Sequence, residues 1–308
     1  MTCRAALPRI FDGVRVAVCW GLGVLMANLL PGQVNAAPIT FITALPVASG
    51  EFVAREQVIV GRSGEDPGTS ERDRRETAAV TALGYGISGE WAVFGVVPYR
   101  DIELRSTTGV RRASGLGDLS ILLRYVAWRR DQRGGTLRVA PFIGIKAPTG
   151  SNNARDALGL LPSSVQIGSG SWDSFAGVVV TRQTLHYQFD GQLRYQYNTE
   201  ADGFQAGSLL RLDGSFQYRV LPSEFSGGIP DFLYAVLEAS LVTQKENRLA
   251  GAVDVNSGGT RLFLTPGIQY VTRRWILEGA VAIPVVENLH GTALEAGNTW
   301  RVGVRANF

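Results

Sequence analysis

The chain has 308 residues, of which 45% are hydrophobic and 19% are charged, with a formal net charge of +3. This apolar content and low net charge exclude an intrinsically disordered chain. The length alone fits two soluble domains, but an all-β barrel of this size is a single domain.

The N-terminal residues have the features of an export signal. Three arginines precede an apolar core over residues 16–30, and Ala36 ends a small-residue cleavage motif. These features predict a signal peptide over residues 1–36, removed before Ala37. A membrane anchor is the alternative, which the shortness of the apolar core disfavours. Both cysteines lie in this segment, and its three arginines and one aspartate account for most of the basic charge. The remaining charge gives no reason to expect a nucleic-acid partner.

Strict alternation of apolar and polar residues characterises the rest of the chain. Over residues 185–198, Leu, Tyr and Phe side chains take one set of positions, and His, Gln, Asp, Arg and Asn take the other. Helical spacing cannot separate these sets, whereas successive residues of a strand point to opposite faces. The same pattern predicts about twelve strands, near 51–62, 76–88, 91–104, 117–128, 135–148, 172–183, 185–198, 205–220, 231–243, 260–271, 275–285 and 299–308.

The lengths of the connections and strands distinguish two architectures. Short connections alternate with long ones, as in outer-membrane barrels with short periplasmic turns. The long connections are expected at 63–75, 105–116, 149–171, 199–204, 244–259 and 286–298. A soluble β-sandwich would also alternate, but soluble strands average about 5–6 residues, and several segments here reach ten or more. We therefore predict an all-β, transmembrane, antiparallel up-and-down β-barrel with about 12 strands and both termini periplasmic.

Aromatic residues and the last strand support this prediction. Trp91 and Tyr99 lie on one face of a predicted strand, as do Trp300 and Phe308 on the last one, which suits aromatic girdles at two membrane interfaces. The strand that ends at Phe308 resembles the signal by which the barrel-assembly machinery recognises its substrates. We expect residues 37–50 to form an N-terminal periplasmic segment and 51–308 the barrel. The expected location is the outer membrane of a Gram-negative bacterium, in contact with its lipids and lipopolysaccharide.

No catalytic or metal-binding constellation is visible in the sequence. Only two histidines are present, His186 and His290, and no cysteine follows residue 36. A His/Cys metal site is therefore excluded, and nothing marks a Ser-His-Asp triad. We expect no enzyme activity and no cofactor, with His186 as a hydrogen-bonded residue of the lumen.

Four ordered motifs carry a family resemblance. They are the stretch 44–55, Gly115-Leu116-Gly117-Asp118-Leu119, Lys146-Ala147-Pro148-Thr149-Gly150 and Gly168-Ser169-Gly170-Ser171-Trp172-Asp173. Their order and spacing resemble the outer-membrane family named for the meta-pathway of phenol degradation, over roughly residues 40–308. The resemblance implies a β-barrel transporter or channel that takes up small aromatic or apolar molecules, and it supplies no catalytic residue.

On this interpretation the polar face of each strand points into the lumen. The predicted pore-lining residues are Asp118, Arg124, Arg138, Lys146, His186, Asp190, Arg194, Arg211, Asp213, Arg219, Glu238, Arg301 and Arg305. Glu278 belongs to the same polar face, on which positive groups exceed negative ones. These residues either form a structural network of ion pairs, because buried charge must be paired, or set a preference for anions in a pore.

Three functional hypotheses follow from the predicted barrel. The first is passive uptake of one class of small molecule through a narrow path, with the loop 149–171 as a candidate constriction and residues 37–50 as a possible obstruction. The second is a structural or surface-interaction barrel with a sealed lumen. The third is a lipid-modifying enzyme, which would require a histidine and a serine within hydrogen-bond reach.

Overall fold

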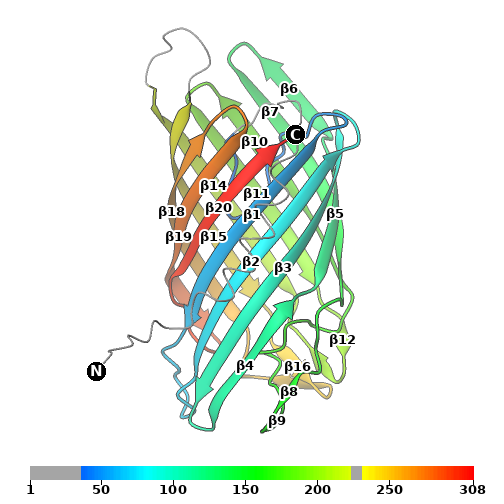
Figure 1. Ribbon diagram of the computed structural model, residues 1–308, viewed down its shortest axis with the longest axis vertical. Helices are drawn as coiled ribbons and strands as arrows, with labels where there is room; N and C mark the ends of the chain where they lie inside the picture. Colours follow the sequence, from blue (N-terminus) through cyan, green and yellow to red (C-terminus); the bar gives the residue numbers. More distant parts are fainter. Residues whose placement is uncertain (1–35, 223–230) are drawn as a thin grey trace, which may run out of the picture.

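A computed structural model describes residues 36–222 and 231–308. These residues confirm the all-β prediction: they form a closed antiparallel barrel (Figure 1). The sheet closes where β1 (Phe52–Ser63) pairs with β20 (Thr299–Asn307). No helix in the described part of the chain is long and apolar enough to cross a membrane.

The described residues form twelve positions around the barrel, which we name staves. Each stave is one strand or a set of strands in line, and it pairs with the staves that precede and follow it in the sequence. The main strands are β1, β2 (Asp73–Gly86), β3 (Trp91–Ser106), β5 (Leu119–Tyr125), β7 (Gly135–Ala147), β10 (Asp173–Thr184), β11 (Tyr187–Tyr197), β14 (Leu209–Leu221), β15 (Phe232–Gln244), β18 (Gly259–Val271), β19 (Trp275–Leu289) and β20. Their meander order confirms the up-and-down topology expected from the alternating connections.

The fourth stave differs from the prediction. It consists of β4 (Gly109–Leu116), β5 and β6 (Trp128–Gln132), which pair in turn with β3 and β7. The expected long loop at 105–116 is therefore wrong: β3 runs to Ser106 and turns directly into β4. Alternation did not reveal this hairpin because the residues of the hairpin are mostly polar on both faces. Such a composition is expected where a sheet extends beyond the membrane.

The two ends of the barrel differ. At one end, which we name the short-turn end, tight turns join β2 to β3, β6 to β7, β10 to β11 and β18 to β19, and Phe52 lies beside Phe308. At the long-loop end, the connections carry small sheets: β8 (Arg155–Asp156) with β9 (Gly159–Leu160), and β12 (Glu200–Ala201), β13 (Phe204–Gln205), β16 (Asn247–Leu249) and β17 (Ala252–Asp254) together (Figure 1). The connection around 221–230 lies largely outside the described residues.

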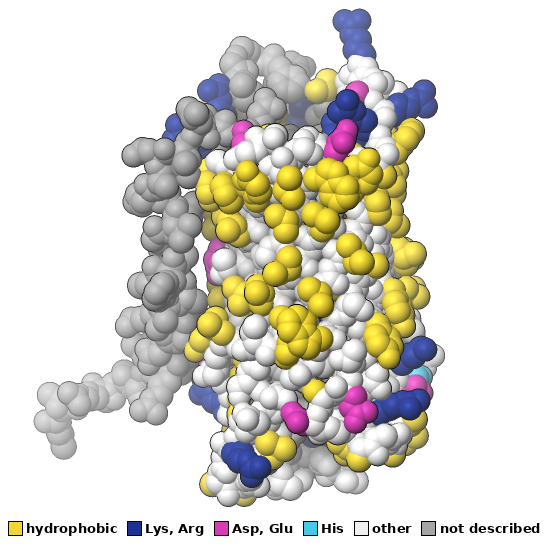
Figure 2. Space-filling view, turned by 90° about the vertical axis from the view of Figure 1, so that its right-hand side faces the viewer, with side chains coloured by type: hydrophobic (Ala, Val, Ile, Leu, Met, Phe, Trp, Pro, Cys, Tyr) yellow, Lys and Arg dark blue, Asp and Glu magenta, His cyan; other side chains and the backbone are white. Residues whose placement is uncertain are grey.

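The exterior is apolar and the interior polar, which is the reverse of a soluble protein. Ile143, Ile268 and Val302 are between 62 and 66% exposed, whereas Gln188, Gln217, Gln269 and Glu238 are at most 1% exposed. Hydrophobic side chains spread over the middle of the visible face, with most charged ones towards its two ends (Figure 2). Such an exterior suits acyl chains, and closure leaves no sheet edge unpaired within the bilayer.

Aromatic side chains gather at the short-turn end. The rings of Trp91 and Tyr125 lie 4.5 Å apart, and those of Tyr270 and Trp275 lie 5.7 Å apart. Each pair joins the end of one strand to the start of its neighbour, so together they form part of a girdle at one membrane interface.

Residues 36–50 run inside the barrel, as expected of a segment that obstructs the lumen. Ile39, Phe41, Ala44 and Leu45 are all at most 7% exposed. We name residues 36–50 the plug. The plug leaves the lumen across Gly86, where an added Cβ would lie 2.1 Å from the Ala48 carbonyl oxygen, so only glycine permits this approach.

Candidate functional site

The plug crosses the lumen and is anchored first on β15. The Glu238 carboxylate, which is fully buried, accepts hydrogen bonds from the backbone N–H groups of Ile39 at 2.6 Å and Thr40 at 3.1 Å. It also accepts one from the Thr40 hydroxyl at 2.5 Å. Charge-assisted bonds of this kind are about twice as strong as neutral ones. Glu238 therefore holds the first half of the plug.

A second anchor lies on the opposite side of the lumen. The Arg124 guanidinium donates to the carbonyl oxygens of Thr43 and Leu45, the latter at 2.7 Å. On β10, the Thr181 hydroxyl accepts a hydrogen bond from the Ala44 N–H at 2.8 Å. Ala44 also packs among buried apolar residues of β7 and β10. The plug is thus tied to both sides of the barrel by backbone groups that have no strand partner.

Glu278 on β19 joins the plug to the seam of the barrel. Its Oε1 accepts hydrogen bonds from Arg55 Nη2 at 2.6 Å and Gln57 Nε2 at 2.8 Å. The same Arg55 and Gln57 groups donate to the Ile39 carbonyl oxygen, at 2.7 and 3.0 Å. Arg305 lies farther away, with its Nη2 at 3.9 Å from Glu278 Oε2. Arg55 and Gln57 therefore bridge the Glu278 carboxylate and the Ile39 carbonyl oxygen of the plug.

The lumen has one filled side and one open side. On β10, β11, β14, β15, β18 and β19, buried polar residues bond to one another, as Gln192 and Ser240 do to Asp213 at 3.1 and 2.6 Å. The inner faces of β2, β3 and β5 instead carry small or apolar residues, which we name the apolar wall: Ala78, Val80, Ala82, Phe94, Val96, Pro98 and Leu122. The unfilled space of the lumen lies along this apolar wall.

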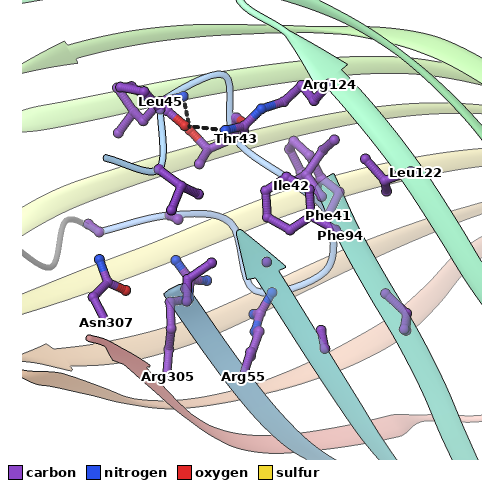
Figure 3. A pocket seen from close by; sticks show the side chains of 18 residues that line it. Phe41, Ile42, Thr43, Leu45, Arg55, Phe94, Leu122, Arg124, Arg305 and Asn307 are labelled. Carbon is purple, nitrogen blue, oxygen red and sulfur yellow. Dashed lines mark hydrogen bonds between the residues drawn. The ribbon is translucent and has the colours of Figure 1, made fainter. Parts of the chain in front are cut away.

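Two spaces occupy that side of the lumen. The vestibule, of about 560 Å³, is lined by Arg74, Arg100 and Arg301 among others and lies towards the long-loop end. The cavity, of about 150 Å³, lies between the plug and the barrel (Figure 3). Val96 lines both spaces. The two spaces therefore lie next to each other along the apolar wall, with Val96 between them.

The predicted pore-lining residues divide into three groups. Arg124, Asp190, Asp213, Arg219 and Glu238 are buried in the lumen, at 4% exposure or less. Arg194, Arg211, Arg301 and Arg305 also occupy inward positions of their strands.

The other predicted residues lie at the ends of the barrel. At the long-loop mouth, the Lys146 ammonium lies 2.5 Å from Asp173 and 3.6 Å from Asp118. At the short-turn rim, Arg138 lies 3.5 Å from Asp131. His186 is exposed in the turn before β11, with Nδ1 3.0 Å from Arg219 Nη2. It does not lie in the lumen, because the strand begins one residue after it.

The loop 149–171 lies at the long-loop mouth and not in mid-lumen. Leu161, Val165 and Ile167 pack on the inward-facing Ile102 and Leu104 of β3. Arg74 Nε donates to the Ser164 carbonyl oxygen at 2.9 Å. The loop therefore narrows the outer part of the vestibule, while the plug occupies the lumen near the short-turn end.

Arg55 and the apolar wall are the site features that the sequence analysis missed. Arg55 and Glu56 are adjacent on a strand with charge on both faces, so alternation does not reveal which one points inward. Phe94 and Phe142 point into the lumen. Alternation had placed both on the inward face of their strands, but we had expected only polar residues to form the site.

The two histidines of the described residues contact charged side chains. No group of three or more His, Cys, Asp or Glu residues among them is placed to hold a metal ion. His186 contacts Arg219, and His290 Nδ1 lies 3.1 Å from Glu246. No histidine–serine hydrogen bond is found within residues 36–222 and 231–308.

Comparison with known proteins agrees with this architecture. The chain is similar in fold to an outer membrane channel from Pseudomonas putida F1, with a TM-score of 0.68, 11% identity, and coverage of 89% of this chain and all of that one. It also matches the β domain of the Bordetella autotransporter BrkA (TM-score 0.46, 14% identity, 84% and 100% covered). The translocator domain of NalP from Neisseria meningitidis has a TM-score of 0.43 and 12% identity, with 98% of this chain and 100% of that one covered.

The family comparison is more specific. No curated protein matches the chain in sequence. Residues 68–282, however, match the family described as MetA-pathway of phenol degradation. This match spans more than half of the chain, and the closed barrel with an apolar exterior agrees with it. The protein therefore belongs to the MetA-pathway of phenol degradation family and is a channel-like barrel of the outer membrane.

Proposed function

We propose that the protein is a channel for passive uptake of a small aromatic or apolar molecule across the outer membrane. The observation that carries this proposal is the pair of spaces along the apolar wall, which share Val96 and total several hundred Å³. A barrel with a purely structural role would gain packing energy by filling this space, because protein interiors are close-packed.

The composition of the apolar wall supports the proposed solute class. An apolar molecule leaving water gains roughly 25 cal/mol for each Å² of apolar surface that it buries. Ala78, Val80 and Val96 offer such a surface, whereas the polar residues on the opposite side of the lumen bond to one another. Between the ion pairs of Glu76 with Arg74 and Arg100 in the vestibule and Arg124 beside the plug, the wall offers a solute a largely apolar surface.

The proposed orientation places the short-turn end in the periplasm, as in other barrels with short periplasmic turns. Both the start of β1 and Phe308 then face the periplasm, and the vestibule opens to the outside. The inward-facing charged residues, among them Arg100 and Arg301, line the path in this proposal. Phe308 is available there to the barrel-assembly machinery, and lipids and lipopolysaccharide surround the apolar exterior.

A sealed, non-transporting barrel is the second candidate, and the plug is the observation that favours it. The plug is anchored at Glu238 and Arg124 on opposite sides of the lumen. In a sealed barrel, these contacts would block all flux. In a channel, a small solute passes beside the plug along the apolar wall.

Solute flux through the purified full-length protein distinguishes the two candidates. We expect ion conductance in planar bilayers and swelling of protein-containing liposomes in phenol-sized neutral solutes. The variant Val96→Trp, which fills the junction of the two spaces, should lower the flux at least tenfold. Val97→Trp is the matched control, since the adjacent residue of β3 points to the lipid. Absence of conductance and swelling for both the full-length protein and a variant shortened within 151–167 would refute the channel.

A further inference from the structure

The cavity between the plug and the apolar wall has the size of a single aromatic ring. Its volume is about 150 Å³, and its apolar lining includes Phe41, Phe94 and Leu122. A cavity of about this volume in a protein core binds benzene. These three side chains lie together on one side of the cavity, with Arg55, Arg305 and Asn307 on another (Figure 3). The cavity therefore has both an apolar and a cationic part.

Three arginines line this cavity, and they differ in how closely carboxylates pair with them. Arg55 is paired with Glu278 at 2.6 Å, but the same carboxylate is 3.9 Å from Arg305. Arg305 has only a 3.5 Å contact with the Pro38 carbonyl oxygen in addition. Arg124 is 2% exposed and donates hydrogen bonds to two backbone carbonyl groups. Arg55 and Arg305 thus share Glu278, with Asp190 and Glu238 farther from Arg305, and within the described chain Arg124 has no carboxylate at ion-pair distance.

Arg124 has one guanidinium N–H group that could donate a hydrogen bond to a ligand. Arg124 Nε is buried and has no hydrogen-bond partner among the described residues. The guanidinium lies 5.0 Å from the centre of the Phe94 ring, beside the apolar part of the cavity. A buried donor without a partner costs about 1–3 kcal/mol, and more when the group is charged. A ligand with a negative oxygen would remove that cost.

The approach to the cavity is also basic. The vestibule is lined by five cationic residues and two acidic ones: Arg62, Arg74, Arg100, Lys146 and Arg301 against Glu76 and Asp118. A low-dielectric channel lined by one sign of charge concentrates ions of the opposite sign. The two spaces therefore favour the same charge of solute.

From this geometry we propose that the cavity is a binding site for the anion of a single-ring aromatic or similarly sized apolar acid. The carboxylate lies against the guanidinium group of Arg305, and the ring lies against Phe41, Phe94 and Leu122, on the side of the cavity where Arg124 lies. The proposal rests on the channel function only for its role in transport, since the binding site itself requires no flux.

Calorimetry on the purified full-length protein in detergent tests the site without any variant. Benzoate, benzyl alcohol and acetate serve as probes, because they separate the ring from the charge. We expect benzoate to bind at least tenfold more tightly than either of the others. Equal affinity for benzoate and benzyl alcohol would overturn the anion site, and equal affinity for benzoate and acetate would overturn the ring pocket.

Two variants and their controls locate the binding site. Arg305→Gln removes one cation, and Ala82→Phe fills the cavity from the apolar wall; each should weaken benzoate binding at least tenfold. Arg138→Gln is the control, since Arg138 lies at the short-turn rim, 3.5 Å from Asp131, and lines neither the cavity nor the vestibule. Ala79→Phe is the control on the lipid face of β2. Unchanged binding in both cavity variants, or equal loss in the controls, would refute this location.

Flux measurements separate this proposal from the channel proposal. Liposomes that admit neutral solutes, with no benzoate binding in calorimetry, would refute the anion site and leave the channel intact. Benzoate binding without flux of any solute would refute the channel and leave the site intact.

Discussion

Replacing Glu238 by glutamine tests how strongly one of the anchors, a buried carboxylate, holds the plug. The side chain keeps its size, but its charge is lost and an NH2 group takes the place of one oxygen. This NH2 group faces donors, since Ile39 N–H, the Thr40 N–H and the Thr40 hydroxyl all point at the carboxylate. The plug should therefore be released more often, while the barrel stays closed.

The size of the effect follows from the bonds that are lost. A hydrogen bond to a charged group contributes about 1.5–3 kcal/mol, and three bonds to one carboxylate are not additive. Glutamine retains one acceptor, so the free energy that holds the plug should fall by about 2–4 kcal/mol. Each 1.4 kcal/mol corresponds to a factor of ten. The population with the plug released should therefore rise about 30- to 700-fold.

Cysteine labelling measures this population. Both native cysteines precede residue 36, so an Ala44→Cys background carries one thiol in the described chain, at a position that is fully buried. The rate of maleimide labelling should rise by the stated factor in Glu238→Gln, with longer open events in planar bilayers. Asp213→Asn is the control: this buried carboxylate bonds to Arg211, Gln192 and Ser240, and not to the plug. Equal labelling of the wild-type and Glu238→Gln backgrounds would refute the reasoning.

Three further predictions concern the ends of the chain and one loop. The mature protein should begin at Ala37, which intact mass spectrometry of protein from the outer membrane checks. Deletion of Phe308 removes two backbone hydrogen bonds to Phe52 and a ring contact at the seam, so the yield of folded, heat-modifiable barrel should fall severalfold. The Arg72 guanidinium holds the pKa of Asp66 well below its usual range, so amide protection in residues 64–72 should persist at neutral pH and decline only below about pH 4. In Asp66→Asn, hydrogen exchange should be faster at neutral pH and should lose this acid dependence.

Alternation, together with the lengths of the strands and of the connections, was sufficient to predict the barrel from the sequence. A membrane strand must expose apolar side chains to lipid on one face, so Leu193 and Val302 reveal the orientation of their strands without any tertiary information. The same rule placed Glu238 and Asp213 in the lumen. It failed at His186 and at β4, where the chain lies beyond the bilayer and neither face must be apolar.

The plug and the cavity depended on the tertiary structure. Residues 36–50 have no alternation and form no strand, so nothing local shows that Glu238, about two hundred residues away in the chain, accepts their backbone N–H groups. Whether Arg124 faces a carboxylate, a carbonyl group or a solute is likewise set by what lies across the lumen. Local sequence determined which residues point inward, because the bilayer acts on each strand separately. Only closure of the sheet determined which of them meet, because those contacts join staves that are distant in the chain.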